Sequence, residues 1–323
     1  MRNDLSLFFM IILLTIGTPR LPAMELIFVT LSNNTVVTFD VSLNTGTAVQ
    51  NSAVTFASTN LNGPQGIAID SFGNVYVANG NANTISKFNS AGTFVSSIAS
   101  NLSFVNGIDI DSNDNLFAVN NTGNSISKFN SSGVFQSSIS SNLASPSGIT
   151  ISSSGTIYAA NNNLNTISVF DSSGAFQSTI STALNGPRGL ALDAFGNLYA
   201  ANRNANTVSK FNSSGTFLAT IGSAANLSNP VGLAIDSSGN LYAANLVGNT
   251  ISKYDAAGTF QFSWSTASNP RYLAFVPVPE PSTWILGTIA VCNVLFLINR
   301  RRKYSTAPQR QLANDARRRS GLS

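Results

Sequence analysis

The 323-residue chain contains no histidine and a single cysteine. Without an imidazole it has no histidine general base, no Ser–His–Asp arrangement and no histidine ligand for zinc. The cysteine, Cys292, lies in a hydrophobic run, so the chain can form no internal disulfide and offers no cluster of thiolate ligands. Any catalytic site would have to use Asp, Asn and Arg, and we expect no catalytic residue, metal site or cofactor.

Charge is also scarce, because only 9% of the residues are Asp, Glu, Lys or Arg, against about 25% in typical soluble domains. Asn, Ser, Thr and Gly are abundant instead, as in exported bacterial surface proteins. Residues 24–277 hold 7 basic and 10 acidic residues, whereas residues 278–323 hold 8 basic and 2 acidic ones. The basic charge therefore lies in the tail, which indicates membrane topology and argues against a nucleic-acid partner.

A repeat of about 40 residues organises the middle of the chain. Its first glycine occurs as Gly66, Gly107, Gly148, Gly189 and Gly232. Each copy contains four short runs rich in β-branched and aromatic residues, separated by Asn, Asp, Ser and Gly. Such runs are typical of antiparallel strands joined by tight turns. A period of this length with four strands predicts a β-propeller with one blade per repeat.

The two ends of the repeat region complement each other. Leu26–Thr30 aligns with Val75–Asn79, and the segment to residue 58 supplies a second, third and fourth strand, with a long hairpin from Asp40 to Gly46. At the other end, Pro270–Phe275 supplies only a first strand. We therefore predict an all-β, six-bladed propeller over residues 24–276 with four-stranded blades. Pairing of Tyr272–Phe275 with Leu26–Thr30 should close it.

Aspartates begin the first turn of several copies and a glycine follows three residues later, as at Asp70, Asp193 and Asp236. We expect these carboxylates to bind backbone amides of their own turns and not a metal ion. Together with the sequence around them, from Pro64 to Asn79 and in two later copies, they resemble the NHL-repeat family of propellers. The resemblance implies the propeller fold, which in that family serves binding platforms, signalling modules and a few enzymes.

One departure from the family pattern recurs at the end of the second strand. Asn stands there where the family often has Asp, at Asn79, Asn120, Asn161, Asn202 and Asn245. The exchange removes charge from the loop face and argues against a metal site there.

Both ends of the chain carry targeting features. Residues 1–23 resemble a secretory signal, with Arg2 before the apolar run Leu5–Gly17 and a cleavage position at Ala23; an N-terminal membrane anchor is the alternative. Residues 277–303 combine three elements in order. These are Pro279, Glu280 and Pro281, then an uncharged run, Trp284–Asn299, and then the cluster Arg300, Arg301, Arg302 and Lys303.

The uncharged run predicts a transmembrane helix whose basic cluster stays in the cytoplasm. The three elements together resemble the PEP-CTERM sorting signal of Gram-negative bacteria. That resemblance implies processing by an exosortase, a membrane transpeptidase-like enzyme, and release to the cell surface or an extracellular matrix. A plain single-pass anchor is the alternative. We expect the basic tail, residues 304–323, to be disordered.

A ligand-binding face is predicted where the first strands begin. The residues at this position are Gln65, Asn106, Ser147, Arg188, Val231 and Arg271, and repeat equivalence places them around one mouth of the central channel. Arg203 lies at the same end. An anionic glycan or a carboxylate could bind there, although solubility and loop packing would also explain these residues. Lys87, Lys128, Lys210 and Lys253 recur on third strands and are interpreted as solvated blade tips.

These features together predict an exported propeller of the cell surface or matrix, made as a membrane-anchored precursor. It would act as a non-enzymatic binding or scaffold module for an extracellular polysaccharide or protein. The alternative is an exported lyase or lactonase-like enzyme that uses Asp, Asn and Arg at the channel mouth. Three convergent carboxylates there would favour the enzyme.

Overall fold

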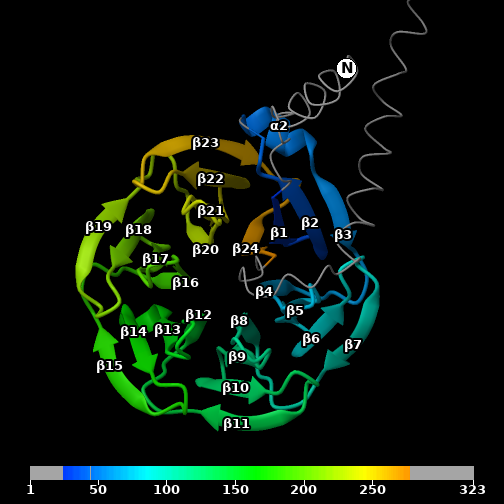
Figure 1. Ribbon diagram of the computed structural model, residues 1–323, viewed down its shortest axis with the longest axis vertical. Helices are drawn as coiled ribbons and strands as arrows, with labels where there is room; N and C mark the ends of the chain where they lie inside the picture. The colour runs from blue at the N-terminus through cyan, green and yellow to red at the C-terminus, as the bar shows by residue number, and fades with distance from the viewer. Residues whose placement is uncertain (1–24, 44, 277–323) are drawn as a thin grey trace, which may run out of the picture. The chain divides into compact units, whose positions relative to one another are not determined.

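The computed structural model describes residues 25–43 and 45–276, which form a ring of six four-stranded antiparallel sheets around a central axis (Figure 1). The predicted all-β, six-bladed propeller is therefore confirmed. The predicted signal segment, the Pro279–Pro281 motif, the apolar run, the basic cluster and the tail all lie outside the described residues. Among the residues that are described, no helix has the length and apolar character needed to cross a membrane.

The blades are numbered in chain order, and their strands are given from the axis outward. Blade 1 consists of β24 (Pro270–Phe275), β1 (Leu26–Leu31), β2 (Thr35–Asp40) and β3 (Val54–Ala57). Blade 2 consists of β4 (Pro64–Ile69), β5 (Val75–Asn79), β6 (Thr84–Phe88) and β7 (Phe94–Ile98). Blade 3 consists of β8 (Val105–Ile110), β9 (Leu116–Asn120), β10 (Ser125–Phe129) and β11 (Phe135–Ile139). Blade 4 consists of β12 (Pro146–Ile151), β13 (Ile157–Asn161), β14 (Thr166–Phe170) and β15 (Phe176–Ile180), with a short 3-10 helix at Asn162–Leu164. Blade 5 consists of β16 (Pro187–Leu192), β17 (Leu198–Asn202), β18 (Thr207–Phe211) and β19 (Phe217–Ile221). Blade 6 consists of β20 (Pro230–Ile235), β21 (Leu241–Asn245), β22 (Thr250–Tyr254) and β23 (Phe260–Ser265).

Aspartate-capped turns shape the hairpins between first and second strands. The Asp70 carboxylate accepts hydrogen bonds from the amides of Phe72 and Asn74, at 3.0 and 2.8 Å. Gly73 closes the turn at a φ of 78°, a conformation that residues with a Cβ rarely adopt. The equivalent aspartates of blades 5 and 6 make the same pairs of amide bonds. The predicted bonding of these carboxylates to backbone amides is thus confirmed.

The ring closes through strands from opposite ends of the described chain. In blade 1, β24 runs antiparallel to β1 and pairs Val29 with Leu273 and Ile27 with Phe275. The predicted closure is therefore confirmed. The sequence alignment of Leu26–Thr30 with the second strand of the repeat was wrong by one residue, because Leu31 and not Thr30 lies opposite Thr35. The turn after β1 is one residue shorter than its equivalents, and this deletion shifted the sequence alignment.

The connection from β2 to β3 differs from the predicted hairpin. It contains the helix α2 (Gly46–Asn51), whose first turn is capped by Thr45, since its Oγ1 accepts a hydrogen bond from the amide of Ala48 at 3.2 Å. Val49 is fully buried and fixes the helix against the blade. A single helical turn of six residues is too short to show a sequence period, so the hairpin prediction was wrong.

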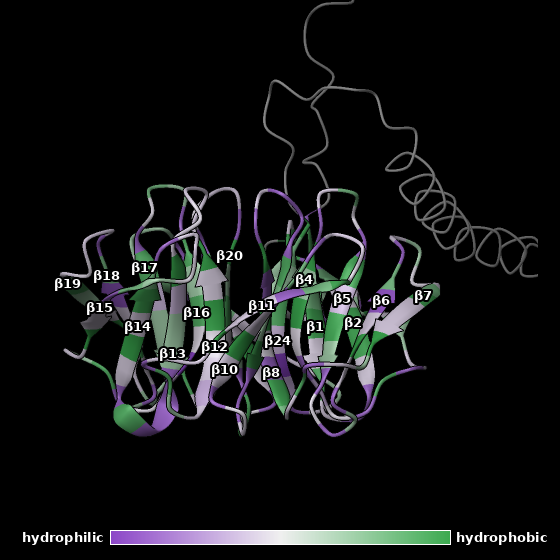
Figure 2. Ribbon diagram, turned by 90° about the horizontal axis from the view of Figure 1, so that it is seen from below, coloured by the Kyte–Doolittle hydropathy of each residue, from purple (hydrophilic) through white to green (hydrophobic). Residues whose placement is uncertain are grey.

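The hydrophobic core lies between neighbouring blades. Six clusters of buried side chains are each shared by two adjacent blades. Between blades 1 and 2, for example, Phe28 and Tyr272 pack with Ile67, Val75 and Phe88. Figure 2 shows apolar residues along the strands of the ring. Because both faces of a blade are buried, apolar residues occupy adjacent positions in the inner strands.

Candidate functional site

The six innermost strands stand side by side around the axis in the order β24, β4, β8, β12, β16 and β20 (Figure 1). Their close approach depends on the repeated glycines. A Cβ on Gly66 would lie 2.5 Å from the carbonyl oxygen of Asn106, and one on Gly107 would lie 2.7 Å from that of Ser147. Only glycine fits at this distance. Five of the six equivalent positions are glycine, and the sixth is Tyr272.

Tyr272 crosses the central channel. Its hydroxyl donates a hydrogen bond of 3.0 Å to the carbonyl oxygen of Ser147 on β12, the strand opposite β24 in the ring. The side chain is only 9% exposed. Burial raises the pKa of the Tyr272 phenol, and the nearby Arg188 guanidinium offsets part of that rise. The phenol therefore spans the channel to Ser147, one of the residues predicted to surround the mouth.

The residues predicted to surround the mouth separate into two groups. Gln65, Asn106, Ser147 and Val231 are buried between the inner strands. Arg188 and Arg271 are half-buried and remain accessible. Neighbouring members are in contact, since Nη1 of Arg271 donates to Oε1 of Gln65 at 3.0 Å. The arginines are thus the members of this set that a ligand could reach.

Arg188, Arg203 and Arg271 form one cationic group, which we call the arginine mouth. Burial lowers the pKa of Arg203 and of Arg271, and the charge of Arg188 lowers both further. Arg203 is oriented by a hydrogen bond of 2.9 Å from its Nε to Oδ1 of Asn229. Across residues 25–43 and 45–276, no ion pair involves any of the three. The charge of Arg188 repels the other two guanidiniums, and an anion would relieve that repulsion.

Two buried polar atoms among the residues predicted to surround the mouth lack hydrogen-bond partners. They are Nε of Arg271, a donor, and Oδ1 of Asn106, an acceptor. Both are buried, and a buried polar atom without a partner costs about 1–3 kcal/mol. Both atoms lie beneath the surface, so a ligand at the mouth would bind through the accessible parts of the arginines. Sequence reasoning could not find this feature, because the orientation of a side chain depends on its neighbouring blades.

The recurring lysines are not solvated tips, as the sequence had suggested. The ammonium group of Lys87 lies 4.9 Å from the centre of the Tyr76 ring and 3.7 Å from Oδ2 of Asp70. Lys128, Lys210 and Lys253 lie over Phe117, Tyr199 and Tyr242 in the same way. Because each lysine is half-buried against an aromatic ring of the adjacent strand, these residues stabilise the blades.

The recurring asparagines are buried and do not face the loop surface. Nδ2 of Asn79 donates to Oγ1 of Thr84 at 3.1 Å and to Oγ of Ser86 at 2.9 Å, and its Oδ1 accepts from the amide of Asn62 at 3.1 Å. The asparagines of blades 3 to 6 make equivalent bonds. Each one ties the loop that enters a blade to the second and third strands. The expectation that they modify the charge of the loop face was therefore wrong.

The carboxylates near the turns stay with their own hairpins. Asp70, Asp193 and Asp236 each bind the side chains of an Asn and a Tyr of the same blade, besides the turn amides. Within the described part of the chain, no three or more acidic, cysteine or histidine side chains form a group that could hold a metal ion.

Comparisons with known proteins place the chain in a family. Residues 48–291 match the model of the virginiamycin B lyase family. Among solved structures, one chain of a nidogen–laminin complex superposes with a TM-score of 0.71 at 17% identity, covering 78% of this chain and 98% of that one.

Virginiamycin B lyase from Staphylococcus aureus is also similar. Its TM-score is 0.55 at 20% identity, with 65% of this chain and 73% of the lyase covered. A catalytically inactive histidine-to-alanine variant of that lyase, solved with quinupristin, superposes with a TM-score of 0.55 at 21% identity and covers 66% of this chain and 75% of the variant. A search of curated proteins found no match. Since the family model spans most of the propeller, this chain belongs to the virginiamycin B lyase family.

Proposed function

We propose that this chain is an exported binding module that captures an anionic group at the arginine mouth without catalysing a reaction. The observation that carries the proposal is the group of Arg188, Arg203 and Arg271, which has no acidic partner among the described residues. Guanidinium groups bind carboxylates and phosphates through paired hydrogen bonds and keep their charge at any physiological pH.

The Tyr272 side chain supports binding at one mouth. Because Tyr272 crosses the axis, a ligand that enters beside Arg188 would stop at the phenol ring and not pass through. The accessible guanidiniums of Arg188 and Arg271 favour a ligand that carries an acidic group. A uronic acid residue of an extracellular polysaccharide has this chemistry.

Family membership keeps an enzyme as the second candidate, and the lack of histidine argues against it. The related lyase is described as inactive when one of its histidines is replaced by alanine. This chain has no histidine at all, so it cannot supply that group. A lyase or lactonase-like activity here would need Asp, Asn or Arg in its place.

Export and sorting complete the proposal. The Pro279–Pro281 motif, the apolar run and the Arg300–Lys303 cluster support processing by an exosortase-type enzyme and a location at the cell surface or in the matrix. A closed propeller suits such a role, because its edge strands and loops are arranged on a rigid ring.

Calorimetric titration of the full chain with oligogalacturonate, a carboxylated saccharide, tests the anion site. We expect binding that weakens as salt rises, because salt screens charge. Arg188→Gln and Arg271→Gln should each weaken it by about 10- to 100-fold, the loss expected for a hydrogen bond to a charged group. Lys128→Gln is the matched control, since Lys128 lies over Phe117 within blade 3.

Two results would contradict the proposal. Equal binding of a neutral oligogalactose would show that charge is not recognised, and an equal loss with the Lys128 control would show that the arginines have no special role. Cleavage of the saccharide during the titration would instead favour the enzyme candidate.

A further inference from the structure

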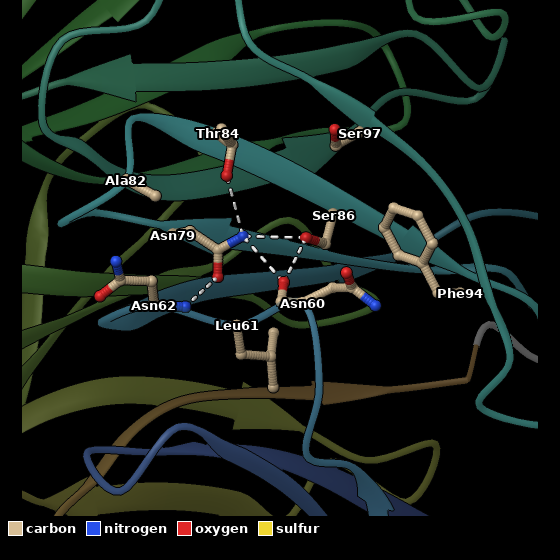
Figure 3. A pocket seen from close by; sticks show the side chains of 9 residues that line it. All are labelled: Asn60, Leu61, Asn62, Asn79, Ala82, Thr84, Ser86, Phe94 and Ser97. Atoms are coloured by element: carbon tan, nitrogen blue, oxygen red, sulfur yellow. Dashed lines mark hydrogen bonds between the residues drawn. The ribbon is translucent and has the colours of Figure 1, made fainter.

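Polar pockets lie on the flanks of blades 2 and 3, and none of the three mouth arginines lines them. The pocket of blade 2 has a volume of about 280 Å³ and lies between the loop that enters the blade and strands β6 and β7 (Figure 3). Blade 3 has an equivalent pocket of about 310 Å³. In Figure 3 the Phe94 ring stands at one end of the pocket and Asn62 at the other, with Thr84 and Ser97 on one side.

The two pockets are built from equivalent residues. Asn60, Asn79, Ser86, Phe94 and Ser97 line the first, and Asn101, Asn120, Ser127, Phe135 and Ser138 line the second at the same positions. All of these side chains are uncharged. Part of each lining is fixed internally, because Oγ of Ser86 donates to the carbonyl oxygen of Asn60 and Oγ of Ser127 to that of Asn101, both at 2.6 Å.

Blades 4, 5 and 6 repeat the same framework. In each, a serine of the third strand bonds to the carbonyl oxygen of the entering loop, through Ser168, Ser209 and Ser252. A phenylalanine begins the fourth strand of all five blades, and Phe94, Phe135, Phe176, Phe217 and Phe260 are each 36–40% exposed. Three residues further on, every copy has a hydroxyl: Ser97, Ser138, Thr179, Thr220 and Ser263.

Blade 1 breaks the pattern. At the positions of Asn79 and Ser86 it has Leu31 and Val37, as the pairing of β1 with β2 shows. It therefore lacks the polar framework, and the ring has five equivalent flank positions.

The chemistry of these positions fits a sugar. Hydroxyl and amide groups can exchange hydrogen bonds with sugar hydroxyls, and an aromatic ring can pack against the C–H face of a pyranose through its electron-rich surface. On blade 2, the side chains of Asn62 and Ser97 make no hydrogen bond to other described residues and so remain available. A volume near 300 Å³ is at the lower end for ligand pockets and suits one small unit, not an extended chain.

We propose that the flank pockets of blades 2 and 3, together with the equivalent positions of blades 4 to 6, bind neutral hexose units, so that the propeller is a multivalent binder of a neutral polysaccharide. The absence of charge from the linings favours a neutral sugar over a uronic acid or phosphate. Five weak sites on one rigid ring gain strength when one polymer occupies several of them, because later contacts form at high effective concentration. The inference does not rest on the arginine mouth.

The test uses the immobilised full chain and three neutral polymers in solution, namely dextran, mannan and galactan. We expect at least one of them to bind, and its free hexose to compete. The double variant Phe94→Ala/Phe135→Ala should weaken binding of the polymer by about tenfold through lost avidity. Because Phe94 packs against Phe88 with ring centres 5.9 Å apart, a second pair, Ser97→Gln/Ser138→Gln, fills the pockets from an exposed position and should weaken binding equally.

The control pair is Phe72→Ala/Phe195→Ala, since these phenylalanines are 75% and 89% exposed in hairpin turns outside the pockets. The proposal is overturned if none of the three polymers binds, if the Ser-to-Gln pair binds as well as the unmodified chain, or if the control pair loses as much binding. Arg188→Gln should leave binding of the neutral polymer unchanged, so a failure here is distinguishable from a failure at the arginine mouth.

Discussion

The closing strand can be tested with one leucine. Leu273 lies in β24, is 6% exposed and pairs with Val29 of β1 across the junction of the chain ends. Leu233 has the equivalent position in β20, is 5% exposed and belongs to blade 6, which is continuous in sequence. Comparing Leu273→Ala with Leu233→Ala asks whether the junction is as stable as an ordinary blade.

The expected cost is the same at both positions. Replacing a buried leucine by alanine removes its burial and leaves a cavity, which costs about 2–5 kcal/mol of unfolding free energy. Both leucines belong to clusters that join two neighbouring blades. Since their burial is nearly equal, we expect the two losses to agree within about 1 kcal/mol. Leu218→Ala is the surface control, because Leu218 is 50% exposed on β19, and it should change stability by less than about 0.5 kcal/mol.

Urea unfolding followed by far-UV circular dichroism measures all three variants against the unmodified chain. Our reasoning would be refuted if Leu273→Ala resembled the surface control while Leu233→Ala lost several kcal/mol. That result would mean that β24 is a loosely attached strand whose loss leaves the rest of the ring folded. In that case a chain that ends at Asn269 would also fold. We expect instead that ending the chain at Asn269 destabilises the ring, and that ending it at Pro277 has little effect.

Three further predictions concern pH, metal ions and processing. Burial among the inner strands raises the pKa of Asp109 to about 6 in the folded chain, so the folded state holds this proton more tightly than the unfolded state. The stability that this carboxyl contributes should therefore be full at low pH and be lost as pH rises through about 6. Urea unfolding from acid to neutral pH should show this fall in the free energy of unfolding, and Asp109→Asn should remove it. Thermal melts with a chelator and with added calcium should coincide, because the turn aspartates bind amides; a rise of more than a few degrees with calcium would contradict this assignment, since an ion that binds the native state stabilises it. Glu280→Ala should leave the propeller folded and hold the precursor in the membrane, and mass spectrometry of the secreted fraction checks this: mature protein that still carries Trp284–Ile298 would contradict the sorting proposal.

The fold could be predicted because its determinants are local and repeated. The glycine period from Gly66 to Gly232 sets the blade length, and the turn aspartates fix where the first hairpins reverse. Closure could be predicted because the N-terminal end of the repeat region lacked a first strand, and the C-terminal end supplied a first strand with no others after it. The one-residue error at Leu31 arose where a turn lost a residue, which strand patterns alone do not reveal. The helix α2 escaped prediction because a short helix is fixed by one cap and one buried valine.

The site was less predictable, because it depends on which blades face each other. Repeat equivalence predicted that Arg188 and Arg271 lie at one mouth. It did not predict that Gln65, at an equivalent position, is buried. The sequence shows Tyr272 at a position where the other five copies have glycine. Its contact with Ser147 could be predicted only from the order of the strands around the axis. Lysines were taken for surface groups because the aromatic residue beneath each one lies on a neighbouring strand and not next to it in sequence.

The pairing of β24 with β1 also has a consequence for the order of events during synthesis. The closing strand, Pro270–Phe275, is made about 240 residues after β1, which at about 5–20 residues per second is a delay of roughly 12–50 s. Until then the inner edge of β1 has no partner, and an unpaired edge is open to other chains. The first blade to emerge is thus the last to be completed, and any factor that protects nascent chains would act on that exposed edge.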